Sequence, residues 1–132
     1  MEAAESLSKD GVPIVHLSIH SFTEKLNNQH RLNDIGFLYD PKRPFEKAIS
    51  SQLKQELCSI NPELKVRMNY PYLGTSDGLT NSLRKLFPDK LYAGIEIEMN
   101  QKHFTSNGTC KNNLADEIAS AVENCFKHLV TR

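Results

Sequence analysis

The sequence contains no tryptophan, only three cysteines and no excess of either charge. Sixteen Lys and Arg side chains balance sixteen Asp and Glu side chains, so the basic surplus typical of proteins that bind nucleic acids is absent. Cys58, Cys110 and Cys125 have neither the spacing of metal-ligand pairs nor the density of a disulfide framework. We therefore expect reduced thiols in a cytoplasmic protein that binds no nucleic acid.

Long hydrophobic runs are missing as well. No stretch approaches the roughly 20 apolar residues of a membrane span, and no signal-peptide core precedes Ile14, so no membrane association is expected. The 132 residues can bury a hydrophobic core, and we expect one domain over residues 1–132. Strand and helix patterns alternate along the chain, which predicts an α/β fold with a mainly parallel sheet.

Residues 14–23 have the clearest strand pattern, because apolar side chains alternate there with His16, Ser18 and His20. One face of this strand should lie on the core. The other face is polar and ends at His20, at the carboxyl end of the strand, where open α/β sheets place their ligands. The alternative is a half-exposed edge strand with two ordinary histidines.

Residues 91–99 form a second strand of this kind, with Glu96 and Glu98 on the face opposite its apolar side chains. An unpaired buried carboxylate is costly, so these two side chains face either solvent or a cation. Shorter strands are expected at 35–39 and 64–68. Residues 24–33 are expected to form a polar loop, which at this length is either functional or simply solvated.

Three amphipathic helices are expected. The first begins at Pro44 and ends at Asn61-Pro62, because proline suits a first helical position and residues 45–60 repeat apolar side chains every three to four positions. The second carries Leu79 to Phe87, with Ser76 or Asp77 as its N-cap. The third is the C-terminal helix over residues 112–131, with acidic residues in its first turn.

Residue chemistry alone does not establish a metal site. On one strand His16 and His20 would lie roughly 13 Å apart, too far to share an ion, whereas a catalytic zinc needs about three protein ligands. Glu96 fits a general base, and Arg31 or Arg67 fits a bidentate anchor for an anionic substrate group. No P-loop, dinucleotide-binding glycine pattern or nucleophile elbow is present.

Five strings occur in a fixed order and are more specific than the periodicity. They are HLSIHSFT (16–23), RLNDIGFLYDP (31–41), VRMNYPY (66–72), DGLT (77–80) and GIEIEMNQ (94–101). Together, between residues 12 and 101, they resemble the C-terminal half of the N-formylglutamate amidohydrolase family.

This resemblance implies a zinc-dependent hydrolase with the three-layer α/β fold of zinc carboxypeptidases, its mainly parallel or mixed sheet flanked by helices. The substrate would be a small N-acyl amino acid such as N-formylglutamate. His20 would be a zinc ligand and Glu96 the catalytic base, while Arg31, Asn69 and Tyr70 would border the substrate.

Two departures from the family pattern affect this reading. Glu24 stands where the family usually has a proline after His-Ser-Phe-Thr. Family members are also roughly twice as long, and their first half supplies a histidine and an acidic zinc ligand. We therefore expect an incomplete chain that binds zinc weakly or not at all by itself and that associates with itself or with the missing half. The alternatives are an inactive homologue that serves as a binding or structural module, and a generic α/β domain without a site.

Overall fold

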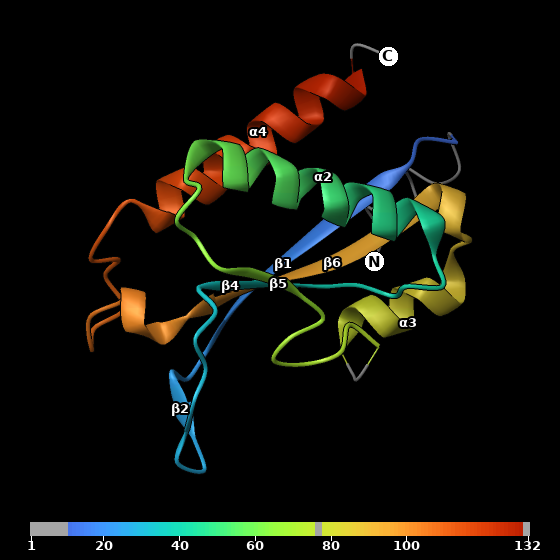
Figure 1. The fold of residues 1–132 in the computed structure, drawn as a ribbon. Helices are drawn as coiled ribbons and strands as arrows, with labels where there is room; N and C mark the ends of the chain where they lie inside the picture. The colour runs from blue at the N-terminus through green and yellow to red at the C-terminus, as the bar shows by residue number, and fades with distance from the viewer. Residues whose placement is uncertain (1–10, 76–77, 131–132) are drawn as a thin grey trace.

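The computed structural model describes residues 11–75 and 78–130 (Figure 1). Its main sheet has four strands in the order β1-β6-β4-β5. These are β1 (Ile14–Phe22), β4 (Ile35–Leu38), β5 (Val66–Met68) and β6 (Tyr92–Asn100). β1 runs parallel to β6 and β4 parallel to β5, whereas β4 and β6 are antiparallel. The sheet is therefore mixed, as the predicted fold class allows.

The helices lie on both faces of the sheet and give three layers (Figure 1). α2 (Pro44–Ile60) and α4 (Leu114–Val130) cover one face, and α3 (Leu79–Leu86) lies on the other. The apolar stripe of α2 at Ile49, Leu53 and Leu57 is buried against Ile95 and Ile97 of β6. This burial confirms that alternate residues of β6 face the core and leave the polar residues between them on the α3 side.

Residues 24–33 form a small hairpin where we expected a loop. β2 (Lys25–Leu26) pairs antiparallel with β3 (Gln29–His30). The connecting Asn27 and Asn28 have φ angles of 51° and 64°, a left-handed conformation that asparagine tolerates and that a tight two-residue turn requires. Each strand of this hairpin has only two residues, which is too short for an alternating pattern to be recognised in the sequence.

Two 3-10 turns, η1 (Asp89–Leu91) and η2 (Gln101–His103), flank β6. Gly78 occupies the N-cap of α3, while the expected caps Ser76 and Asp77 lie outside the described residues. All three cysteines are free. Across the described ranges, no helix is both long and apolar enough to cross a membrane.

Candidate functional site

The polar residues of β1 and β6 face each other through the register of the two parallel strands. Ser18 pairs with Glu96, and His20 pairs with Glu98. Paired positions of neighbouring parallel strands direct their side chains to the same face of the sheet. The predicted zinc ligand His20 and the predicted base Glu96 therefore share one face and lie two positions apart along adjacent strands.

Glu98 is the most buried carboxylate of this face. It is 5% exposed, and its Oε2 atom has no hydrogen-bond partner among residues 11–75 and 78–130. Burial raises the pKa of Glu98, the charge of Glu96 raises it further, and His20 and Arg31 act in the opposite direction. We did not single out Glu98 from the sequence as a site residue, because only the strand register shows that it lies opposite His20.

Glu96 lies beside the start of α3. The hydroxyl of Thr80 donates a hydrogen bond of 3.4 Å to Glu96 Oε1. A Cβ atom at Gly78 would lie 3.7 Å from the same oxygen, and Gly78 has a φ of 100°, which favours glycine. The first residues of α3 thus form one wall around Glu96.

The two histidines of β1 have separate partners. His20 Nε2 lies 2.8 Å from the hydroxyl of Ser18, and His16 Nδ1 lies 2.8 Å from the Tyr92 hydroxyl. Burial raises the pKa of Tyr92 to about 12, so the phenol stays protonated and can donate to His16. Burial also lowers the pKa of His16, against the opposing charge of Glu96. His16 is therefore held by the frame of the site, whereas the ring of His20 is exposed.

Arg31 and Tyr70, two of the predicted substrate residues, line one cavity of about 220 Å³. Leu26, Asn27, Gln29 and Pro71 complete its lining. The guanidinium of Arg31 lies 5.3 Å from the ring centre of Tyr72 and donates a hydrogen bond of 3.2 Å to its hydroxyl. These contacts fix the guanidinium close enough to Glu98 to affect its pKa.

Asn69 has a structural task in the turn that bears Tyr70. With a φ of 54°, its Oδ1 accepts hydrogen bonds from the backbone N–H groups of Tyr39 at 3.0 Å and Gly74 at 3.1 Å. The guanidinium of Arg67 lies 4.0 Å from the ring centre of Tyr70. Contact of Asn69 with substrate stays a prediction. The guanidinium of Arg67, the alternative anchor for an anionic group, packs on the ring of Tyr70.

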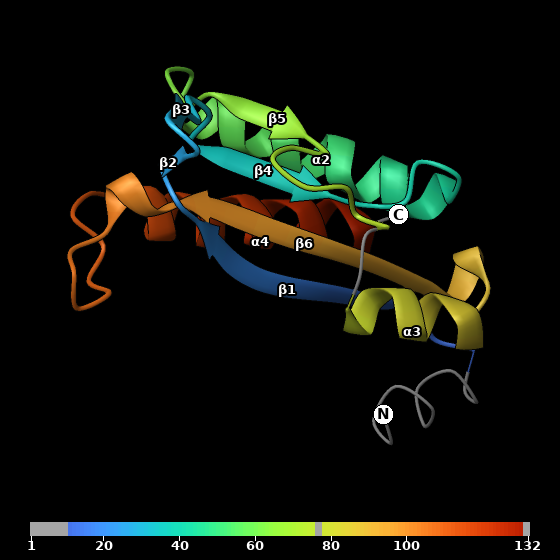
Figure 2. The ribbon, with the colours of Figure 1, turned by 90° about the horizontal axis from the view of Figure 1, so that it is seen from below.

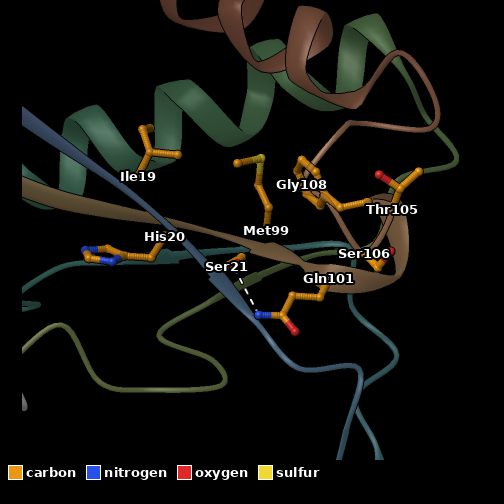
Figure 3. A pocket seen from close by; sticks show the side chains of 9 residues that line it. Ile19, His20, Ser21, Met99, Gln101, Thr105, Ser106 and Gly108 are labelled. Atoms are coloured by element: carbon orange, nitrogen blue, oxygen red, sulfur yellow. Dashed lines mark hydrogen bonds between the residues drawn. The ribbon is translucent and has the colours of Figure 1, made fainter.

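A second, wider cavity of about 740 Å³ opens at the carboxyl ends of β1 and β6 (Figure 3). Its walls are Ile19, His20, Ser21, Met99, Gln101, Phe104, Thr105, Ser106 and Gly108. In Figure 3, Ile19 and His20 leave β1 in different directions, as alternation requires. Gln101 Nε2 donates a hydrogen bond of 3.1 Å to the Ser21 hydroxyl and ties the two strand ends together.

A buried ion pair holds the frame behind the site. Arg84 of α3 makes two hydrogen bonds of 2.8 Å to the carboxylate of Glu46 in α2. The same guanidinium donates 2.8 Å bonds to the carbonyl oxygens of Gly74 and Gly94. Arg84 therefore joins α2, α3, β6 and the turn that follows Tyr70.

The described residues do not fit a zinc ion by themselves. A catalytic zinc takes about three protein ligands and keeps one open position. No group of three His, Cys, Asp or Glu side chains within residues 11–75 and 78–130 could hold a metal ion. Among the described strands, His20 is the only histidine that the register sets opposite a carboxylate. We therefore assign no chemical step to zinc.

Comparison with known proteins identifies the fold. The gene product Atu2144 from Agrobacterium tumefaciens has a crystal structure that matches with a TM-score of 0.63 and 27% identity over 98% of this chain and 47% of that chain. The crystal structure of N-formylglutamate amidohydrolase from Ralstonia eutropha JMP134 matches with a TM-score of 0.63 and 15% identity over 93% of this chain and 45% of that chain.

The resemblance predicted from the five ordered strings is thus confirmed at the level of the fold. The chain spans about half the length of both structures. Its sequence matches no protein-family model and no curated protein.

Proposed function

We propose that this chain forms part of a hydrolase that cleaves a linear amide, namely the N-formyl or a related N-acyl group of an acidic amino acid. The observation that supports this most is the set of polar side chains on one sheet face, where His20 lies opposite Glu98 with Glu96 two positions away. These residues lie toward the carboxyl ends of parallel strands, the usual place for ligands in such sheets. The fold shared with an N-formylglutamate amidohydrolase agrees with this assignment.

Amide hydrolysis needs a base that takes a proton from the attacking water, and a carboxylate is most effective when its pKa approaches the working pH. Glu96 is the predicted base. Glu98 meets the requirement better, because burial raises its pKa and one of its oxygens has no hydrogen-bond partner within the described residues. We therefore propose Glu98 as the proton acceptor, with Glu96 next to it as the charge that supports its raised pKa.

The cavity lined by Arg31 and Tyr70 is our candidate for the acidic side of the substrate. A guanidinium binds a carboxylate by two parallel hydrogen bonds, and here Tyr72 and Phe22 restrict its orientation. A guanidinium held in place loses less conformational freedom when a ligand binds. Arg31 is thus better suited to this task than Arg67, which is exposed.

Zinc stays a proposal for the complete site, with His20 as one ligand. Further ligands would have to come from residues outside the described ranges or from another polypeptide, since those ranges contain no set of three. This same shortfall favours a second candidate function. The chain would then be an inactive homologue that binds an acidic acyl amino acid without hydrolysing it.

Titration with N-formyl-L-glutamate, followed by NMR and by release of formate, tests both candidates. We expect Arg31→Met to weaken binding by roughly tenfold or more, because a charge-assisted pair is lost, and Arg67→Met to change it little. Formate release that Glu98→Gln abolishes and the exposed control Glu63→Gln preserves would support the hydrolase. Binding without formate would support the second candidate, and the absence of both would contradict the site.

A further inference from the structure

Residues 31–33 join the β2–β3 hairpin to β4 and carry the proposed anchor Arg31. They belong to no helix or strand, so their backbone groups need hydrogen-bond partners from elsewhere in the fold. Arg31 is 8% exposed and Asn33 is 2% exposed, which leaves little access for water. Figure 2 shows the arrowheads of β1 and β6 at the same end of the sheet, beside this hairpin. The groups at that end of the sheet therefore determine where Arg31 lies.

Asn100, the last residue of β6, is fully buried and supplies those partners. Its side-chain amide donates hydrogen bonds of 2.9 Å to the carbonyl oxygen of Arg31 and of 3.1 Å to that of Asn33. Its Oδ1 atom accepts a hydrogen bond of 2.9 Å from the backbone N–H of Lys102. Its own backbone N–H donates one of 2.9 Å to the carbonyl oxygen of Asp34. Asn100 thus ties the end of β6 to the segment that carries Arg31.

An amide side chain suits this arrangement because it carries a donor and an acceptor. The hydrogen bond from Lys102 fixes the side-chain oxygen of Asn100 on one side, so its NH2 group faces the two carbonyl oxygens. Aspartate has the same shape but would set a second acceptor and a buried charge against those carbonyls. Leucine would leave both carbonyl oxygens without a donor. The contacts of Asn100 therefore depend on its amide and not on its size.

The side chain of Arg31 is held at its other end by two aromatic rings. Its guanidinium lies 5.3 Å from the ring centre of Tyr72 and 5.8 Å from that of Phe22. It also donates a hydrogen bond of 3.2 Å to the Tyr72 hydroxyl. Phe22 is the residue of β1 that pairs with Asn100 in the strand register. The carboxyl ends of β1 and β6 thus act together on Arg31, one at its guanidinium and the other at its backbone.

We propose that Asn100 is a positioning residue, which fixes the backbone of Arg31 so that the guanidinium meets the carboxylate of an acidic substrate. Glu98 lies two positions before Asn100 and on the same face of β6. One strand therefore places both the proposed proton acceptor and, through Asn100, the proposed anchor. The inference rests on the proposed function for the ligand that Arg31 takes, whereas the hydrogen bonds of Asn100 are independent of that ligand.

Asn100→Ser tests the proposal, because serine can still accept the hydrogen bond from Lys102 N–H but offers no amide to the two carbonyl oxygens. The NMR signal of the Arg31 Nε–H group reports its place beside two aromatic rings, and we expect this signal to move when the backbone of Arg31 is released. The affinity for N-formyl-L-glutamate should fall by roughly five- to tenfold. Asn61→Ser is the matched control and should change neither readout, since Asn61 Oδ1 likewise accepts a hydrogen bond from the backbone N–H two positions on, that of Glu63.

A double-mutant cycle with Arg31→Met separates positioning from a general loss of stability. If Asn100 acts through Arg31, the variant with both replacements should bind N-formyl-L-glutamate no more weakly than Arg31→Met alone. Additive losses of affinity would overturn the proposal, and so would an Arg31 signal that Asn100→Ser leaves in place.

Two further outcomes have a defined reading. If the unmodified chain does not bind N-formyl-L-glutamate, the proposed function fails, and the Arg31 signal alone decides whether Asn100 positions Arg31. Should Asn100→Ser fail to fold, as judged by circular dichroism, the unmodified chain decides. Slow exchange of both Asn100 amide protons, together with nuclear Overhauser effects between Arg31 Nε–H and the rings of Phe22 and Tyr72, supports the proposal. Exchange as fast as that of a free amide contradicts it.

Discussion

Replacement of Arg84 by methionine tests how the frame behind the site is held. The Arg84 side chain is 5% exposed and its partner, the Glu46 carboxylate, is fully buried. Arg84→Met leaves that carboxylate without two hydrogen bonds of 2.8 Å and leaves the carbonyl oxygens of Gly74 and Gly94 without a donor. Breaking a buried pair in this way costs about 3–5 kcal/mol.

The lower end of that range applies here, because Arg43 Nε remains 3.2 Å from Glu46 Oε2. We therefore expect the free energy of unfolding in urea to fall by about 3 kcal/mol. Lys127→Met is the control, since the Lys127–Glu123 pair is more than two-thirds exposed on both sides and such pairs contribute about 0.5 kcal/mol or less. A loss below about 1 kcal/mol for Arg84→Met would refute the claim that this pair holds α2, α3 and β6 together.

Three further predictions concern stability. Burial raises the pKa of Glu98, so its ionised form opposes folding, and Glu98→Gln should stabilise the chain by about 1 kcal/mol at neutral pH. This gain should disappear in acid, where the carboxyl group of Glu98 is protonated. Urea midpoints at the two pH values test this, and a variant less stable than the unmodified chain at neutral pH would contradict it. A Cβ at Gly36 would lie 1.9 Å from the backbone oxygen of Tyr70, so Gly36→Ala should lower the free energy of unfolding by about 3 kcal/mol. An unchanged thermal midpoint would contradict this, because it would mean that the turn at Tyr70 moves aside without cost. Burial opposes ionisation of Asp34, but hydrogen bonds from the backbone of Lys65 and from His103 outweigh it and lower the pKa of Asp34. The stability that Asp34 contributes should therefore be present above its unfolded pKa and be lost as the pH falls through the lower folded value. Asp34→Asn should remove this part of the loss of stability in acid, as measured by urea unfolding across that pH range.

Local periodicity was enough to predict most elements of the fold. The helix expected from Pro44 to residue 60 is α2, and the strand expected over residues 91–99 is β6 at Tyr92–Asn100. These segments are long and strongly amphipathic, so burial of one face determines both their type and their extent. Short segments were harder, and the hairpin around Asn27 was missed.

The site depends on long-range pairing, which a single sequence does not contain. The sequence indicated that Glu96 and Glu98 share a face, but only the register with β1 sets Glu98 opposite His20. Asn69 shows the same limit, since its hydrogen bonds reach Tyr39, thirty positions away. The antiparallel pairing of β4 with β6, which makes the sheet mixed, likewise follows from chain crossings and not from local patterns.

The most direct test of the account is a ¹³C NMR titration of the Glu98 carboxyl group in the unmodified chain and in two variants. If His20, Glu96 and Glu98 face one another, His20→Ala should raise the pKa of Glu98 further, because a lowering charge is removed, and Glu96→Gln should lower it, because a like charge is removed. Opposite shifts from the two replacements are the predicted result. A Glu98 pKa that neither replacement moves would contradict the shared site.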